Sequence, residues 1–277
     1  MSGLYNFTVV TALLDIGRGK WAEQTRSYNT YLLYMQRNLR LDVNMLVYMG
    51  SEGQPFVQWM RRGRENRTRI VDTALKDLPY YKSRRKKLCV GTSAYNFLSK
   101  FSTNGHRRMN APKALGETTT NSYSWNWGET NGQSLHKAVR ENPFNTTYFV
   151  WLDAGYGHGQ DVHPKDGIWI PQHLFDHPDE ITFIQRSPGV LYFLPQERRL
   201  HKLSINILAG LFFAGGDQAV QELYRLQQEK FQEWMEEGVV DDDQTMYMLL
   251  YYRQPSLFNL VYGDWYDVFK LFNVAKS

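Results

Sequence analysis

Two acidic segments of the sequence carry side chains that could do chemistry. Asp153 directly follows the apolar run Tyr148–Leu152, and the acidic stretch 241–243 precedes Gln244 where a helical pattern begins. A carboxylate at the end of a buried strand needs a partner, because an unpaired buried charge is costly. A cation, or a hydrogen bond from a sugar or ribose hydroxyl, would supply that partner. The sequence therefore predicts that Asp153 faces a ligand, with a turn-forming aspartate as the alternative.

Asp242 and Asp243 belong to a run of three aspartates at the start of the helical pattern. Acidic residues are favoured at helix N-termini through capping and the helix dipole, so a structural role is one interpretation. Three in a row exceed what capping needs, and their repulsion favours protonation of one of them unless a cation or sugar hydroxyls intervene. Such a carboxyl group suits a general base that deprotonates an acceptor hydroxyl. Asp242 and Asp243 are therefore candidate catalytic residues, and the resemblance described below adds Gln244 to this catalytic set.

A third set of polar side chains follows Asp153 within ten residues and comprises His158, Asp161 and His163. Two imidazoles and a carboxylate have the right chemistry to bind Zn²⁺. Their spacing matches no zinc-ligand pattern, so a hydrolytic metal site is kept as an alternative.

The elements that must position these residues alternate between strands and helices. Ser27 is a suitable N-cap for a helix, and Pro55 lies near the start of a second helix. Near-continuous apolar runs predict strands over residues 7–14, 44–49 and 148–152, and residues 68–75 fit a weaker strand. This alternation predicts a parallel, doubly wound sheet with right-handed crossovers. Because ligands bind at the carboxyl ends of such strands, we expect the loops after residues 14, 49, 75 and 152 to converge.

The remaining segments are assigned from their periodicity and their breakers. Residues 134–142 form a short helix that Pro143 ends, and residues 102–131 form a long polar loop. Residues 203–213 are apolar, and no element is assigned to them. Further expectations are a basic helical region over 78–100, a hairpin between 181–186 and 190–193, and helices over 220–238 and 246–252.

Small and basic residues could support a phosphate-bearing ligand. Gly210 and the glycine pair at 215–216 allow close approach of the backbone to a ligand, although tight packing explains them as well. Arg18, Lys137 and Arg84 are, in that order, the cations expected near a diphosphate. Lys137 lies on the short helix that leads into the strand before Asp153.

Composition narrows the class of protein. With 277 residues and 42% hydrophobic content the chain can bury a large core, and a single domain is expected over 1–277. The net charge of +4 permits a nucleotide or polyphosphate partner without requiring one. The basic cluster 84–87 is short and occurs once, so no nucleic-acid partner is predicted. Aromatic residues make up 15% of the chain and often line sugar or base pockets.

Targeting signals and cysteines indicate the compartment. The single cysteine, Cys89, excludes an internal disulfide, which suits a reducing environment. The N-terminal residues lack a secretory signal, and no apolar run approaches the roughly 20 residues of a membrane span. A soluble, cytoplasmic protein without a transmembrane segment is therefore expected.

Several of these segments together resemble a known family. Residues 8–18, 142–155 and 209–216, with Asp243 and Gln244, are similar in order and type to the HtrL/YibB proteins. These in turn resemble GT-A glycosyltransferases, which implies an α/β fold with a mostly parallel, GT-A-like (Rossmann-like) sheet flanked by helices. The resemblance also implies a nucleoside-diphosphate sugar donor, a glycan or other hydroxyl acceptor, and often Mn²⁺ or Mg²⁺.

The resemblance assigns roles to individual positions. Thr11, Asp15 and Arg18 are expected to contact the nucleotide within a nucleotide-binding half, 1–155, and an acceptor and catalytic half is expected over 156–277.

Asp153 is expected to contact the donor ribose, the sugar or a metal ion. Gly155 belongs to the same donor-binding loop, but it replaces the second aspartate of the Asp-x-Asp tip that holds a divalent ion in GT-A enzymes. Asp243 and Gln244 resemble an Asp-Gln pair near the transferred sugar. The alternative is a non-catalytic sugar- or nucleotide-binding module with the same fold.

Overall fold

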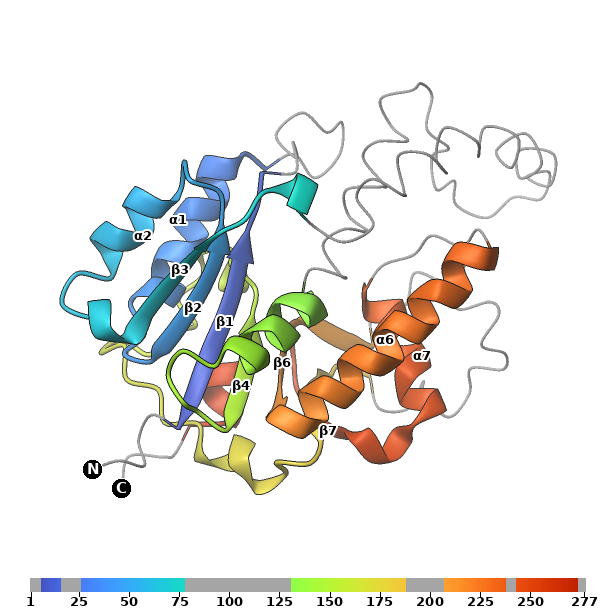
Figure 1. Ribbon diagram of the computed structural model, residues 1–277. Coiled ribbons are helices and arrows are strands. Elements are labelled where there is room, and N and C mark those ends of the chain that lie inside the picture. Colours follow the sequence, from blue (N-terminus) through green and yellow to red (C-terminus); the bar gives the residue numbers. More distant parts are fainter. Residues whose placement is uncertain (1–5, 16–25, 78–130, 188–206, 238–242, 274–277) are drawn as a thin grey trace, which may run out of the picture.

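The computed structural model describes residues 6–15, 26–77, 131–187, 207–237 and 243–273 (Figure 1). The predictions for residues 78–100 and 190–193, and those for Arg18, Arg84 and Asp242, lie outside these ranges, as does nearly all of the polar loop. Within the described ranges the chain alternates between strands and helices, as the sequence pattern predicts.

One seven-stranded sheet forms the centre of the molecule, in the order β3-β2-β1-β4-β6-β5-β7. Neighbouring strands are parallel except that β6 runs antiparallel to both β4 and β5. The strands are β1 (Phe7–Leu13), β2 (Asn44–Met49), β3 (Thr68–Asp72), β4 (Tyr148–Leu152), β5 (Ile181–Gln185), β6 (Leu208–Gly216) and β7 (Phe258–Tyr262).

The predicted fold class, a mostly parallel GT-A-like α/β sheet flanked by helices, is confirmed by this strand order. β1, β2 and β4 are buried along their whole length, which explains their near-continuous apolar sequences. Because β1 to β4 are parallel, the loops after residues 13, 49, 72 and 152 lie at one edge of the sheet. This edge is the one where the sequence predicts a ligand.

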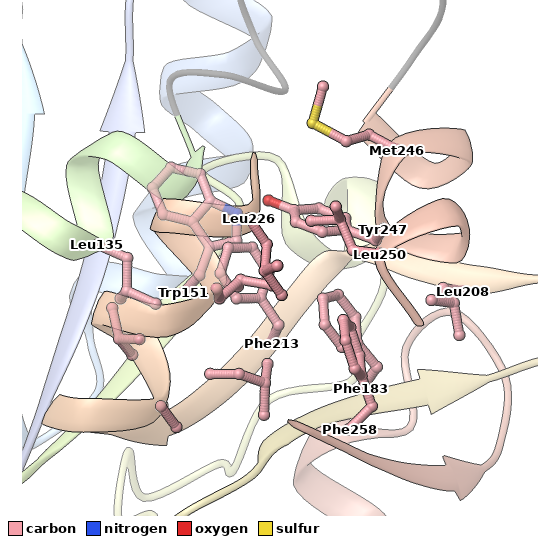
Figure 2. Packing of buried hydrophobic residues seen from close by; sticks show 14 of the residues in the cluster. Leu135, Trp151, Phe183, Leu208, Phe213, Leu226, Met246, Tyr247, Leu250 and Phe258 are labelled. Carbon is pink, nitrogen blue, oxygen red and sulfur yellow. The ribbon is translucent and has the colours of Figure 1, made fainter. Parts of the chain in front are cut away.

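One face of the sheet is covered by the helix at residues 131–141, by α6 (Asp217–Glu237) and by α7 (Asp243–Arg253). Trp151 of β4 and Phe213 of β6 lie on this face, and their rings stack 6.2 Å apart. Figure 2 shows how Leu226 and Tyr247 pack over these strand residues. No helix in the described ranges is long and apolar enough to cross a bilayer.

The opposite face packs against α1 (Tyr28–Leu39), α2 (Gln54–Met60) and α8 (Val268–Leu271). Ser27 caps α1 as predicted, because its hydroxyl accepts a hydrogen bond from the Thr30 backbone N–H at 3.1 Å. α1 therefore begins at the edge of the sheet where β1 ends.

The structure corrects two predicted elements and adds a strand that was not predicted. The strand expected over 68–75 ends at Asp72 and a short 3-10 helix, Leu75–Asp77, follows it. The predicted hairpin between 181–186 and 190–193 is wrong, because β5 pairs with β6 on one side and with β7 on the other. The apolar segment around 208–216 is a strand, and it contains Gly210 and the pair 215–216.

Arg61 lies directly after α2 and holds the connection between α1 and β2 in place through hydrogen bonds. Its side chain is only 1% exposed, and its guanidinium donates to the backbone carbonyls of Leu39, Leu41, Val43 and Arg67 and to the Thr68 hydroxyl. Burial, helped by Arg64 and Arg67, lowers its pKa to about 10, so the group stays charged at neutral pH. The carbonyls supply its hydrogen-bond partners, and the Asp42 carboxylate opposes the fall in pKa.

Replacing Arg61 by methionine should destabilise the fold strongly. The apolar stem is kept, but buried carbonyls lose their donor, which costs about 1–3 kcal/mol for each group left without water. We expect a loss of about 3 kcal/mol in the free energy of unfolding, measured by urea denaturation. Arg62→Met at the neighbouring exposed position is the matched control and should change stability by less than about 0.5 kcal/mol. Equal stability of the two variants would contradict this role.

Candidate functional site

Asp153 lies in a tight loop at the carboxyl end of β4. Its side chain is 6% exposed, and its Oδ1 accepts a hydrogen bond from the Gly155 backbone N–H at 2.6 Å. Its own backbone N–H donates to the carbonyl of Leu211 on β6 at 2.9 Å. The loop therefore continues the β4–β6 pairing one residue beyond the strand and fixes the carboxylate at the sheet edge.

Gly155 is required by close packing. A Cβ at this position would lie 2.9 Å from Cε1 of Tyr31 and 3.0 Å from Oδ1 of Asp153. The position where an Asp-x-Asp tip would carry its second carboxylate thus has no room for a side chain. Tyr31, in the first turn of α1, occupies that space.

The Asp153 loop is also held from the α1 side. The buried amide of Asn38 donates from Nδ2 to the carbonyl oxygen of Asp153 at 2.8 Å. This fixes Oδ1 of Asn38 as the atom facing Nε2 of His163, 2.7 Å away, so Nε2 carries the proton. Burial, followed by the charge of Arg37 and opposed by Asp161, lowers the pKa of His163 to about 4. His163 is therefore neutral at physiological pH.

A group of polar rings surrounds the same loop. Nε2 of His158 lies 3.4 Å from the Arg26 guanidinium, and its Nδ1 lies 2.8 Å from the hydroxyl of Tyr266. Burial raises the pKa of Tyr266, the Arg26 charge opposes this rise and the Asp153 carboxylate adds to it. The charges of Arg26 and Asp153 thus both affect the pKa of the Tyr266 hydroxyl. The two residues therefore lie on the same part of the sheet edge that follows β4.

Asp243 and Gln244 form the first turn of α7, three residues earlier than the sequence pattern suggested. Gly210 of β6 faces both of them, since a Cβ there would lie 3.0 Å from Asp243 Oδ2 and 3.2 Å from Gln244 Cγ. Asn131 donates from Nδ2 to the same Asp243 oxygen at 3.1 Å. The absence of a side chain at Gly210 is what lets α7 approach the strand.

β6 therefore joins the two acidic groups. Leu211 binds the backbone of Asp153, and the preceding residue, Gly210, contacts Asp243 and Gln244. Asp153 and Asp243 are 90 positions apart in the sequence, yet they contact two consecutive residues of one strand. The pair 215–216, in contrast, sits opposite the start of β4, at the far end of the strand, and packs against Ile181 and Pro178.

The other predicted site residues are placed differently. Asp15 is exposed at the end of β1, and its charge contributes, after burial and Glu52, to raising the pKa of Tyr28 to about 12. Thr11 is completely buried within β1, and its hydroxyl oxygen has no partner in the described part of the chain. Lys137 is half-exposed, 5.4 Å above the ring of Tyr48 and 3.7 Å from Glu141.

The described residues do not fit a metal centre built by the protein alone. Within the described ranges no three His, Cys, Asp or Glu side chains are grouped to hold an ion, and Gly155 offers no second carboxylate beside Asp153. The set considered for a hydrolytic zinc site is divided among separate partners. His158 contacts Arg26 and Tyr266, Asp161 pairs with Arg37 at 2.9 Å, and His163 contacts Asn38.

Sequence reasoning missed Arg26, Asn38, Asn131 and Tyr266. Each lies on an element that the sequence pattern does not link to Asp153 or Asp243, and more than 100 residues separate each from its acidic neighbour. The position of Arg26 just before the Ser27 cap was the one available signal, because helix N-termini at this sheet edge bind anions.

The neutral His163 predicts a pH-dependent contribution to stability. Its pKa is about 4 in the folded protein and about 6.5 in the unfolded chain. The unfolded state binds more protons between these values, so stability is complete above pH 6.5 and decreases as the pH falls towards 4. The loss should reach about 3 kcal/mol at most.

His163→Gln keeps a donor for Asn38 and removes the ionisation. Urea denaturation from pH 7 to pH 4 should show a smaller loss of stability for this variant than for the wild type. His173→Gln, at an exposed position 3.3 Å from Asp176, is the control and should follow the wild type. Identical pH profiles for all three proteins would contradict the lowered pKa and the burial of His163.

Comparison with known proteins places the chain among relatives. Protein HtrL of Escherichia coli (strain K12) is 26% identical over 281 residues, which cover 96% of this chain and 92% of the relative. Among solved structures, mouse xyloside xylosyltransferase 1 in its apo form matches 92% of this chain and 84% of its own, with a TM-score of 0.46 and 8% identity.

A second solved structure is 4-diphosphocytidyl-2C-methyl-D-erythritol synthase from Anaerococcus prevotii DSM 20548. The match covers 94% of this chain and 87% of that one, with a TM-score of 0.39 and 8% identity. At these values an assignment of function must rest on the residues of this chain.

The family model HtrL_YibB, described as "Bacterial protein of unknown function", matches residues 5–274. This match spans nearly the whole chain and includes both the Asp153 loop and the Asp243–Gln244 pair. The chain therefore belongs to the HtrL/YibB family.

Proposed function

We propose that the protein is a glycosyltransferase that moves a sugar from a nucleoside-diphosphate sugar to a glycan or another hydroxyl acceptor. The observation that carries this proposal is the convergence of Asp153 and the Asp243–Gln244 pair on Gly210 and Leu211 of β6. A nucleotide-sugar transferase needs a donor-facing carboxylate and a group that receives a proton within one sugar length of each other. The resemblance of the same residues to GT-A enzymes agrees with this assignment.

The nucleotide is assigned to the edge formed by β1, β2 and β4 within residues 1–155. The N-terminus of α1 points to this edge, its first turn has no acidic residue, and Arg26 precedes its cap. Backbone N–H groups, the helix dipole and a guanidinium together favour the diphosphate. Asp15, Arg18 and Thr11 are proposed nucleotide contacts, Lys137 is a proposed phosphate contact, and the acceptor is assigned to the half over residues 156–277.

In the proposed reaction the acceptor oxygen bonds to the anomeric carbon while the bond from that carbon to the diphosphate oxygen breaks. The leaving diphosphate takes the bonding electrons, and cationic groups such as Arg26 stabilise its charge. The proton of the acceptor hydroxyl passes to a carboxylate, for which Asp243 and the adjacent Asp242 are candidates. Asp153 accepts a hydrogen bond from the ribose or the donor sugar, and Gln244 contacts the transferred sugar.

A second candidate is a binding module that holds a nucleotide sugar without transferring it. The close packing at Gly155 favours this candidate, since it removes a carboxylate that a metal-dependent transferase would use. A thermal-shift screen separates the two functions. UDP, ADP and GDP, with UDP-glucose, ADP-glucose and GDP-mannose, are tested with and without Mn²⁺ or Mg²⁺, followed by an assay for released nucleoside diphosphate. Binding with release supports the transferase, and binding without release supports the module.

Asp153→Asn should abolish turnover while leaving the fold intact. Asparagine still accepts the Gly155 N–H, so the loop geometry is kept and the negative charge is lost. We expect release of nucleoside diphosphate from the donor found in the screen to fall at least about 100-fold, with little change in melting temperature.

Asp161→Asn is the matched control, because this exposed carboxylate lies after the same loop and pairs with Arg37. Its turnover should remain within about twofold of the wild type. Unchanged donor binding and turnover in Asp153→Asn would refute the assignment of this site.

A further inference from the structure

Four buried polar atoms around Asp243 lack a hydrogen-bond partner in the described part of the chain. They are Nε1 of Trp151, Oη of Tyr247, Oδ1 of Asn131 and Oε1 of Gln244. Trp151 and Tyr247 are completely buried, and Asn131 is 1% exposed. A buried polar group without a partner is costly, so such groups are rarely retained without a reason.

The four atoms belong to one region of the fold. Asn131 binds Asp243, Gln244 is the next residue of α7, and Tyr247 lies one helical turn further on. The rings of Trp151 and Tyr247 both pack on Phe213, with centroids 6.2 and 5.2 Å from it. Figure 2 shows these two rings beside Phe213. The group therefore spans the layer between the end of β4 and the first turns of α7.

The hydrogen-bond orientation of two members is fixed by chemistry. The Asp243 carboxylate only accepts, so Nδ2 of Asn131 faces it and Oδ1 is the atom left over. Burial and the Asp243 charge raise the pKa of Tyr247 well above its usual value, so its hydroxyl keeps its proton. Gln227 of α6 approaches this phenol and partly opposes the rise, without reaching hydrogen-bond geometry with Oη.

The set needs a ligand with many groups that both donate and accept. The indole N–H can only donate, the two amide oxygens can only accept, and the phenol can do either. Sugar hydroxyls satisfy all of these at once, and flat aromatic faces suit the apolar faces of a sugar ring. The nearby carboxylate of Asp243 disfavours an acidic sugar.

We propose that Trp151, Tyr247, Asn131 and Gln244 form a binding site for the hydroxyl groups of an uncharged sugar, between β4 and α7. This inference rests on the proposed function, since the sugar is taken to be the one carried by the nucleotide donor. It identifies Trp151 and Tyr247 as residues that determine which sugar is bound. Asp153 and the α1 edge bind the rest of the donor.

Two conservative variants test the site. Trp151→Phe removes the indole N–H, and Tyr247→Phe removes one hydroxyl, while both keep a ring against Phe213. Each should weaken binding of UDP-glucose, or of the donor selected in the screen, about 5- to 50-fold by isothermal titration calorimetry. Affinity for the nucleoside diphosphate alone should stay within about twofold, because neither residue contacts it in this account.

Two further variants are matched controls. Trp169 also has a buried, unpartnered indole N–H within the described ranges, but it lies on the opposite face of the sheet against Phe7. Tyr251 lies one turn beyond Tyr247 on α7. Trp169→Phe and Tyr251→Phe should bind the nucleotide sugar like the wild type. UDP-glucuronic acid, which differs from UDP-glucose by its carboxylate, should bind the wild type at least about tenfold more weakly.

The outcomes are distinguishable. If the wild type binds nucleotide sugars and the Trp151 and Tyr247 variants bind them equally well, the four atoms are satisfied by ordered water and the sugar site is refuted. Equal losses for the sugar conjugate and the nucleotide alone would also refute it, since they indicate a general structural effect. If the wild type binds no nucleotide sugar at all, the proposed function fails and this inference fails with it.

Discussion

The pairing of β4 with the antiparallel strand β6 is the interaction on which the site depends. It places the Asp153 loop beside Leu211 through a backbone hydrogen bond of 2.9 Å. The residue before Leu211 on β6, Gly210, has no side chain, so the first turn of α7 can pack close to the strand. A parallel strand in the same place would reverse this order and put the glycine pair 215–216 beside Asp153. The direction of one strand thus determines which acidic residues meet.

The part of the site on the α1 side of the sheet and the part on the α7 side have different surroundings. On the α1 side, Asn38, Tyr31 and His158 hold the Asp153 loop in one conformation, and Arg26 adds a positive charge. On the α7 side, aromatic rings and amide groups surround Asp243 within a layer that is otherwise apolar. A charged diphosphate suits the first environment and an uncharged sugar suits the second. The two environments meet at the edge of β6.

The sequence predicts part of this arrangement well. β1, β2 and β4 are recognisable because strands buried on both faces are almost continuously apolar, and Ser27 marks the start of α1. β6 escaped detection because its sequence of leucine, alanine, phenylalanine and glycine lacks β-branched residues. Asn38 and Asn131 could not be identified, since their proximity to the acidic residues results from strand order. The hairpin predicted at β5 failed because pairing with β7, over 70 residues away, replaced the local alternative.

The central claim is that Asp153 and the Asp243–Gln244 pair flank the sugar of one donor molecule at β6. A crystal structure with the nucleoside-diphosphate sugar selected by the thermal-shift screen tests it most directly. The account predicts the diphosphate near Arg26 and the N-terminus of α1, with the sugar between Asp153 and the first turn of α7. A donor bound elsewhere on the molecule, or a sugar pointing away from Asp243, would contradict it.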